Sequence, residues 1–313
     1  MALLDLIQKY FFPSGNLHAF AGIQEMLING LQALIFIHAD GSRSIVSSPF
    51  VNSEQLVQEI QEFAYISGVR LDPHYPAHGG EYHHSQSSAA LASFRWHAVI
   101  PPVSRDGPIF SLRKLSWEGL SLSRFGIAAD FSERLLEMMH QGQSMVISGP
   151  TGAGKTSLLC QLLREVCLDE RLIIVESLAE IPRMSSSWVR LCAQADNIDG
   201  RGQFSMQRII EESLRLRPDR LLVGEIRGME ARSYYQALQV IDKGTLTSLH
   251  VHHPSQLIPR LSDLSGLAED LWRQVFELHK ILLLQMQRKT PRLREAFQYQ
   301  SGEFRLIYSS DQT

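Results

Sequence analysis

The feature that most constrains this chain is a glycine-rich run at positions 149–156, which reads Gly-Pro-Thr-Gly-Ala-Gly-Lys-Thr. It matches the pattern G-x-x-x-x-G-K-[ST]. An apolar segment, 145–148, precedes the run and an amphipathic segment, 155–166, follows it, as a strand and a helix would. Glycines let backbone N–H groups curl around phosphate oxygens, and the positive end of the following helix faces the anion. The run therefore predicts a site for a nucleoside triphosphate.

Two side chains of this run have predicted chemical roles. Lys155 would neutralise charge on the β- and γ-phosphates, and the hydroxyl of Thr156 would ligate Mg²⁺. The guanine-specifying pattern N-K-x-D and the transporter signature L-S-G-G-Q are both absent from the sequence. The residues expected to contact the nucleotide here are Gly149, Pro150, Thr151, Gly152, Ala153, Gly154, Lys155, Thr156 and Ser157.

Composition narrows the class of protein around this site. The length of 313 residues suggests two domains at roughly 150 residues each. With 44% hydrophobic and 20% charged residues the chain is ordinary globular material. A net charge of -3 gives no basic footprint, so nucleic acid is not an implied partner. The three cysteines have neither a disulfide framework nor metal-ligand spacing, which favours a reducing compartment.

Membrane signals are weak in this sequence. It contains no run of about 18 apolar residues, so we expect no transmembrane helix. Residues 1–12 carry an early Asp5 and lack both a basic start and a small-residue cleavage site. We predict that they form an amphipathic helix and not a signal peptide, which places the protein in the cytoplasm.

The chain changes character near residue 110. We predict that residues 1–110 form a small α+β domain, followed by a linker over 111–124. Within the domain, the Asp-Gly turn at 40–41 indicates a hairpin. The pair Asn52-Ser53 predicts a polar N-cap for a helix that ends near Gly68. The Pro-, Gly- and His-rich segment 72–88 is typical of a loop.

Residues 125–313 alternate helix and strand, which predicts an α/β domain with a mainly parallel sheet. The C-terminal segments 297–300 and 304–308 flank Ser301-Gly302 and predict an antiparallel hairpin. We expect helices over 131–140, 155–166, 206–216 and 230–241, and strands over 145–148, 172–175, 221–223, 246–249 and 281–284.

A second chemical signal follows the predicted strand 221–223. Glu225 comes just after this strand, where a parallel sheet would bring its carboxylate beside the phosphate loop. There it would orient water for attack on the γ-phosphate, or hold Mg²⁺ through water. The alternative is a solvated glutamate paired with Arg227, and the preceding phosphate loop favours the functional interpretation. No single arginine of this stretch is predicted to act in trans.

The segment from Leu214 to Gly228 matches L-R-x-R-P-D-x-x-x-x-G-E-x-R-G, and three further segments, 25–30, 100–114 and 199–202, support it. These residues resemble the secretion and pilus-assembly traffic ATPase family of type II and type IV systems. The chain is most similar to the tight-adherence (Tad, Flp-type) pilus branch. The resemblance implies a RecA-like P-loop ATPase core with a smaller, PAS-like N-terminal domain.

Two further motifs of this family have counterparts here. The acidic box, usually I-E-D-x-x-E, keeps Glu176 and Glu180 but has Ser177 in place of the aspartate. By resemblance, both glutamates are candidates for Mg²⁺ and water handling. The histidine box keeps His250 near the expected γ-phosphate, while Asp242 stands where the family has its first histidine.

The resemblance also implies trans-acting contacts. Linker and N-terminal arginines of the family reach nucleotide as the ring closes, so Arg113 is a candidate and Arg95 a weaker one. Arg190 resembles a family arginine after the acidic box, whereas a second one is Gln194 here. The histidines at 83–84 and 250–253 are not predicted to bind metal, because no carboxylate or cysteine completes a set.

By resemblance, the working unit is a homohexamer that binds ATP and Mg²⁺ between its domains. Hydrolysis would rock the N-terminal domain about a pivot at 107–116 and push on an inner-membrane platform protein, to assemble a pilus or secrete a substrate. Lost box residues keep open a second hypothesis, a nucleotide-binding scaffold subunit with little turnover. A third is a soluble phosphotransferase with a small acceptor.

Overall fold

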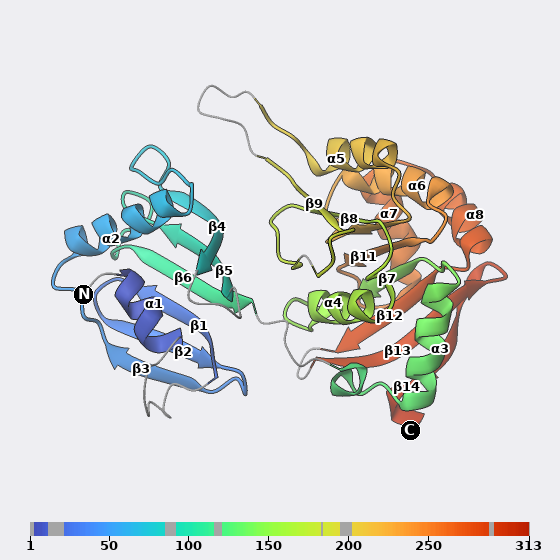
Figure 1. Cartoon of the computed structure of the whole chain (residues 1–313), viewed down its shortest axis with the longest axis horizontal. Helices are drawn as coiled ribbons and strands as arrows, with labels where there is room; N and C mark the ends of the chain where they lie inside the picture. The colour runs from blue at the N-terminus through green and yellow to red at the C-terminus, as the bar shows by residue number, and fades with distance from the viewer. Residues whose placement is uncertain are drawn as a thin grey trace. The chain divides into compact units, whose positions relative to one another are not determined.

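The structure, a computed structural model, describes residues 3–11, 22–84, 92–115, 121–182, 184–194, 202–287 and 291–312. The chain divides into two compact units, Met1–Ser116 and Trp117–Thr313, and each is described by itself (Figure 1).

The first unit is an antiparallel sheet with two helices on one face. Its six strands have the order β3-β2-β1-β6-β5-β4. Alternate residues such as Met26, Ile28, Leu34 and Phe36 are buried under the helices, as the two-residue period of a strand requires. Its elements are α1 (Leu3–Phe11), β1 (Ile23–Asn29), β2 (Ala33–His38), β3 (Arg43–Ser47), α2 (Ser53–Ile66), β4 (Ala77–His84), β5 (Ala92–Val99) and β6 (Ile109–Leu115).

The structure confirms the predicted hairpin turn and the predicted ends of the helix in this unit. The hairpin β2–β3 turns at Gly41, whose φ is 83°, and the side chain of Asp40 accepts a hydrogen bond from the Ser42 N–H at 2.8 Å. Asn52 caps α2 by accepting from the N–H of Gln55 at 2.8 Å. The helix ends just before Gly68, which has a φ of 74°.

Two predictions for this unit are wrong. The segment 72–88 contains the strand β4, because its glycines allow a close approach to β5 that a side chain would block. A Cβ at Gly79 would lie 2.6 Å from the carbonyl oxygen of Trp96. The predicted linker also starts too early, since 111–115 belong to β6, which pairs with both β1 and β5.

The second unit is a mixed eight-stranded sheet of order β14-β13-β12-β7-β11-β10-β8-β9. Six neighbouring strands, from β12 to β9, run parallel, and β13 and β14 add an antiparallel edge. The strands are β7 (Met145–Ser148), β8 (Leu172–Glu176), β9 (Val189–Cys192), β10 (Arg220–Val223), β11 (Thr245–Leu249), β12 (Leu282–Gln287), β13 (Arg292–Gln300) and β14 (Glu303–Ser309).

Helices cover both faces of this sheet and give it two apolar cores. Neighbouring strand residues alternate between the cores: Leu222 packs with α3 and α4, whereas Leu221 and Val223 pack with α5 to α8. The helices are α3 (Ala129–His140), α4 (Lys155–Val166), α5 (Met206–Ser213), α6 (Glu230–Val240), α7 (Leu257–Ser265) and α8 (Glu269–His279), with short 3-10 turns η2 (Leu122–Phe125), η3 (Leu214–Leu216), η4 (Pro254–Gln256) and η5 (Ser310–Gln312). This architecture confirms the predicted α/β, RecA-like core.

The topology brings four loops to one edge of the sheet. Parallel neighbours end at the same edge, so the segments after β7, β8, β10 and β11 all lie there (Figure 1). Strand β11 lies between β7 and β10. The residue that follows β11 therefore sits between the phosphate loop and the glutamate that follows β10.

Candidate functional site: a phosphate loop facing a held glutamate

The phosphate loop, residues 149–154, joins β7 to the start of α4. Gly149, Gly152 and Gly154 have φ values of 143°, 77° and 85°. A Cβ at Gly149 would lie 2.7 Å from the carbonyl oxygen of Met286, and one at Gly154 would lie 2.7 Å from Cβ of Pro291. Glycine is therefore required at both positions by conformation and by space. The loop ends at the N-terminus of α4, where free backbone N–H groups favour an anion.

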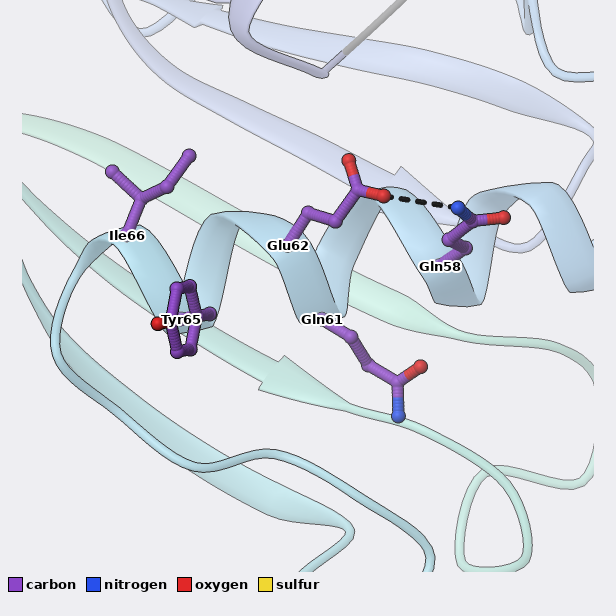
Figure 2. Close-up of a pocket in the computed structure, with 5 residues that line it drawn as sticks. All are labelled: Gln58, Gln61, Glu62, Tyr65 and Ile66. Atoms are coloured by element: carbon purple, nitrogen blue, oxygen red, sulfur yellow. Dashed lines mark hydrogen bonds between the residues drawn. The ribbon is translucent and has the colours of Figure 1, made fainter.

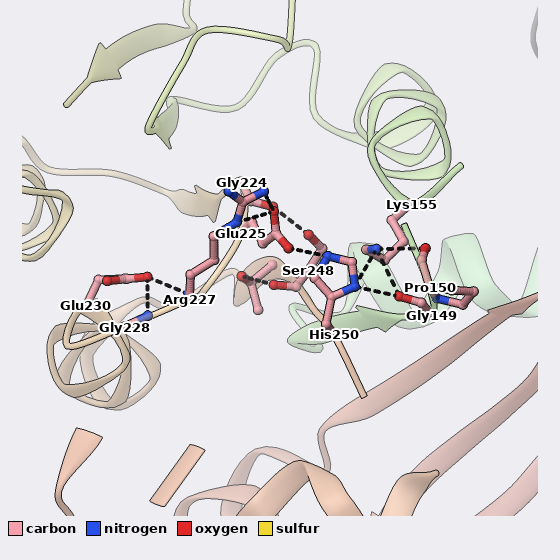
Figure 3. A network of polar contacts seen from close by, with 11 residues as sticks. Gly149, Pro150, Lys155, Gly224, Glu225, Arg227, Gly228, Glu230, Ser248 and His250 are labelled. Atoms are coloured by element: carbon pink, nitrogen blue, oxygen red, sulfur yellow. Dashed lines mark hydrogen bonds and ion pairs between the residues drawn. The ribbon is translucent and has the colours of Figure 1, made fainter. Parts of the chain in front are cut away.

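Lys155 is the first residue of α4 and is only 8% exposed. Its ammonium donates to the carbonyl oxygens of Gly149 at 2.9 Å and of Pro150 at 3.1 Å (Figure 3). Burial lowers the pKa of Lys155, the negative charge of Glu225 opposes that shift, and Arg227 adds to it. The ammonium of Lys155 is thus held against the phosphate loop by two loop carbonyls.

His250 follows β11 and connects the phosphate loop to Glu225. Its Nδ1 lies 3.0 Å from the carbonyl oxygen of Gly149 and 3.3 Å from Nζ of Lys155. Its Nε2 lies 2.7 Å from Oε1 of Glu225, a contact that is an ion pair when the ring is protonated (Figure 3). One imidazole therefore joins the loop after β7 to the loop after β10.

The carboxylate of Glu225 is held from a second side by Arg227. Nε and Nη2 of Arg227 lie 2.7 Å and 2.5 Å from Oε2 of Glu225. The hydrogen bond to Glu225 raises the pKa of Arg227, and the negative charges of Glu180 and Glu230 act in the same direction. The glutamate is thus placed between an arginine and a histidine, and its side chain is 20% exposed.

The backbone that carries Glu225 is fixed by hydrogen bonds to both neighbouring strands. The N–H of Gly224 donates to the carbonyl of Val175 at 2.8 Å, and the hydroxyl of Ser248 donates to the carbonyl of Gly224 at 2.7 Å. The N–H of Ile226 donates to the carbonyl of Ser248 at 3.0 Å. Parallel pairing therefore continues past the end of β10, and the position of Glu225 follows from the sheet itself.

Glu176 occupies a different position from the one expected of a residue that handles metal or water. It is 4% exposed, and its Oε1 accepts hydrogen bonds from the N–H groups of Glu180 at 3.0 Å and Ile181 at 3.1 Å. A Cβ at Gly224 would lie 3.1 Å from its Cγ. The carboxylate of Glu176 thus ties down the turn after β8, which carries Glu180 and the exposed Ser177.

Other predicted residues have contacts of their own within their units. Arg113 belongs to β6 of the first unit, is 62% exposed, and has its Nε 3.4 Å from Oε1 of Glu25. Arg95 is its cross-strand neighbour on β5. Arg190 donates to the carbonyl of Ile181 at 3.3 Å. The predicted motif at 199–202 falls mostly outside the described residues.

Thr156 and Ser157 lie in the first turn of α4, directly after Lys155, and both are partly buried. Their place at the helix N-terminus is the one expected for residues near a bound phosphate. Among the described residues, no group of three or more histidines, cysteines or carboxylates is arranged to hold a metal. His253 instead caps η4 by accepting from the N–H of Ser255 at 3.3 Å.

A hollow lies in the first unit, along the exposed side of α2 (Figure 2). It has a volume of about 410 Å³, and its lining residues are Gln58, Gln61, Glu62, Tyr65 and Ile66. All five come from a single helix, and the only ionisable groups among them are the Glu62 carboxylate and the Tyr65 hydroxyl. This hollow does not bring together the convergent polar groups that a catalytic site needs.

Sequence reasoning missed two supports of Glu225. Ser248 is buried and gives no sequence signal beyond its place in a strand. Glu230 is the first residue of α6, and its Oε1 accepts from the N–H groups of Arg227 at 2.5 Å and Gly228 at 2.8 Å. An acidic residue in the first turn of a predicted helix is a capping signal that could have identified this contact.

A phosphate loop after one strand and a held carboxylate two strands away define a P-loop nucleotide-binding core. The sequence model of the family described as Type II/IV secretion system protein matches residues 89–300. The chain belongs to this family of secretion traffic ATPases, whose members hydrolyse ATP.

The relatives come from conjugation and secretion systems. A Mycobacterium tuberculosis protein, provisionally named as a conjugal transfer protein, is 30% identical to this chain over 224 residues. These residues cover 70% of this chain and 62% of that protein. The conjugal transfer protein TrbB of Rhizobium radiobacter is 28% identical over 66% of this chain and 64% of its own length. The chain thus spans less than two thirds of either relative.

Two solved structures share the fold. The ATPase DotB of Legionella pneumophila superposes with a TM-score of 0.59 at 18% identity, over 84% of this chain and 72% of that one. The pilus retraction motor PilT with bound ADP gives 0.58 at 18% identity, over 91% and 78%. In the described part of this chain, no helix is both long enough and apolar enough to cross a membrane.

Proposed function

We propose that this chain is the Mg-ATP-hydrolysing motor subunit of a bacterial envelope machine that assembles a pilus or secretes a substrate. The observation that carries the proposal is the continuous contact from Lys155 through His250 to Glu225 at the carboxyl edge of the sheet. Membership of a family of ATPases supports the same conclusion.

The residues of the loop fit a triphosphate. Glycines whose Cβ atoms would clash keep the backbone exposed at the N-terminus of α4, and Lys155 supplies a positive charge. Thr156 is the proposed Mg²⁺ ligand, together with Glu225 through water. Bound Mg²⁺ would neutralise charge on the β- and γ-phosphates.

Glu225 is the proposed group that orients the attacking water. Its carboxylate pairs with Arg227, and a carboxylate in this position can accept a proton from water. His250 lies between this carboxylate and the phosphate loop. A movement of either the carboxylate or the loop would therefore alter the contacts of the imidazole. Glu180 contributes negative charge close to Arg227, whereas Glu176 supports the turn that carries Glu180.

We further propose a homohexamer at the cytoplasmic face of the inner membrane that acts on a platform protein. Relatives named for conjugal transfer and a neighbour named as a pilus retraction motor support a role in such machinery. The tight-adherence branch rests on the sequence motifs alone. A nucleotide contact from Arg113 at a subunit boundary remains part of this proposal.

A catalytically weak scaffold subunit is the second candidate, because Ser177 and Asp242 replace family residues. The position of Asp242 argues against a direct effect on the site. It lies between α6 and β11, where its carbonyl packs against Gly142, just ahead of β7. That is the amino edge of the sheet, the opposite edge from Lys155 and Glu225.

The test is Mg-dependent ATP hydrolysis by the full chain, with particle mass read in the same samples. We expect Lys155→Ala to abolish turnover, and Glu225→Gln to lower it by a factor on the order of 10² to 10⁴. Glu303→Gln is the matched control, because Glu303 pairs with Arg305 at the same spacing as Glu225 with Arg227. A ring that binds ATP without turnover would favour the scaffold.

A further inference from the structure

We infer that Arg227 is a positioning residue that fixes the orientation of the Glu225 carboxylate for catalysis. The inference rests on the proposed ATPase function and extends it, because it gives a task to an arginine outside the phosphate loop. The geometry points to this task because each oxygen of Glu225 has its own cationic or ring-nitrogen neighbour, as Figure 3 shows.

The two contacts on Glu225 are complementary. Arg227 places Nε and Nη2 on the same oxygen, Oε2, while the ring of His250 lies against Oε1. The two guanidinium nitrogens hold the position of Oε2, and the ring against Oε1 then limits rotation of the carboxylate about that atom. The orientation of the carboxylate, and with it the direction of its remaining lone pairs, is therefore set by Arg227 and His250 together.

Arg227 is itself anchored at the start of α6. Its N–H donates to Oε1 of Glu230 at 2.5 Å, and the same oxygen accepts from the N–H of Gly228 at 2.8 Å. Glu180 and Glu230 both act to keep the guanidinium charged. The guanidinium thus feels the negative charge of Glu180 and Glu230, while its Nε donates a hydrogen bond to Glu225.

Exposure separates a positioning role from a structural one. The side chain of Arg227 is 67% exposed, and an ion pair that accessible to water contributes little to folding stability. Loss of the guanidinium should therefore leave the fold intact while it releases the carboxylate. High exposure also means that a small cation from solution can enter the place of the missing side chain.

The experiment compares Arg227→Ala and Arg227→Lys with Arg305→Ala in the full chain. We expect Arg227→Ala to lower kcat by a factor on the order of 10 to 100, less than loss of the base itself. Affinity for a fluorescent ATP analogue should change less than about threefold, because the inferred role concerns orientation and not nucleotide binding. Arg227→Lys should retain part of the activity, since a lysine supplies charge without the fork.

Two readouts distinguish positioning from general damage. Guanidinium chloride, far below denaturing concentration, should restore part of the kcat of Arg227→Ala, whereas sodium chloride at equal ionic strength should not. In the Glu225→Gln background, Arg227→Ala should have little further effect, because two residues that act through one step are not additive. Arg305→Ala should match the wild type with and without guanidinium.

Different failures lead to different conclusions. Absence of turnover in the wild type would overturn the proposed function and this inference with it. Normal kcat in Arg227→Ala, or loss of nucleotide affinity without a change in kcat, would overturn the inference alone. If Arg227→Ala does not fold, the same comparison is made with Arg227→Lys, whose kcat must then fall at unchanged nucleotide affinity.

Discussion

The strand β10 has an arginine–glutamate pair near each of its ends, and the two pairs lie in opposite environments. At the amino edge, Arg220 is fully buried, with Nε 2.7 Å from Oε2 of Glu170, whose side chain is 8% exposed. At the carboxyl edge, Arg227 is 67% exposed and pairs with Glu225. The difference shows that burial decides whether such a pair matters for folding stability or for the orientation of a carboxylate.

Burial makes the amino-edge pair expensive to break. Arg220 also donates from Nη2 to the carbonyl of Met139 at 2.8 Å, so it connects β10 to α3 and to the loop before β8. Removing Glu170 would leave the charge of Arg220 buried and unpaired, and removing Arg220 would leave Glu170 with only the longer contact to Nζ of Lys243, at 3.6 Å. At the carboxyl edge water can replace a lost partner, so the expected cost there is to orientation and not to folding.

The largest effect should come from Arg220→Leu, which we expect to lower the free energy of unfolding by about 3–5 kcal/mol. Urea titration followed by circular dichroism measures it. The double change Arg220→Leu with Glu170→Leu should recover a large part of this loss, because no buried charge remains. Arg227→Ala should cost about 1 kcal/mol or less in the same titration. Equal losses at the two edges would contradict the comparison.

A smaller effect should follow from removing one hydroxyl at each edge. Ser248→Ala removes the 2.7 Å hydrogen bond to the Gly224 carbonyl, and Ser144→Ala removes the 2.9 Å bond from the Thr245 N–H. Each should cost about 1 kcal/mol of unfolding free energy. Only Ser248→Ala should also lower ATP turnover, because Gly224 directly precedes Glu225. A turnover loss in Ser144→Ala would show that the edges are not independent.

A further expected effect at the amino edge depends on pH. Burial raises the pKa of Cys167 from 9.0 to about 12. The unfolded thiol ionises first as pH rises, so its contribution to stability is complete below about pH 9 and is lost as pH approaches 12. The stability difference between wild type and Cys167→Ala should therefore shrink over this range in urea titrations. A constant difference would mean that the thiol is not shielded.

Local chemistry in the sequence was enough to predict the phosphate loop. Three features agreed there: an apolar strand, glycines that tolerate positive φ, and an amphipathic helix after Lys155. The strand β4 could not be predicted in the same way. Its Gly- and His-rich sequence has low strand propensity, and it is a strand only because its glycines fit against Trp96 of β5.

The sequence places the candidate site residues at strand ends, but it does not give their contacts. Chain order places Glu225 and His250 at strand ends, yet it does not give the order of the strands in the sheet. The insertion of β11 between β7 and β10 puts His250, and not Glu225, next to Gly149. Likewise, the acidic motif identified Glu176. In the structure Glu176 is buried against Gly224, and its carboxylate stabilises the turn after β8.

The position of β11 in the sheet also fixes the distance between β7 and β10. Neighbouring strands are about 4.8 Å apart, so β7 and β10 stand about 10 Å from each other across the sheet. Hydrogen bonding within the sheet prevents this separation from changing, and the two ring nitrogens of His250 contact the segments that follow the two strands. The second unit therefore behaves as a rigid frame of set width. Movement at this edge must come from rotating side chains and shifting loops, while the strands keep their spacing.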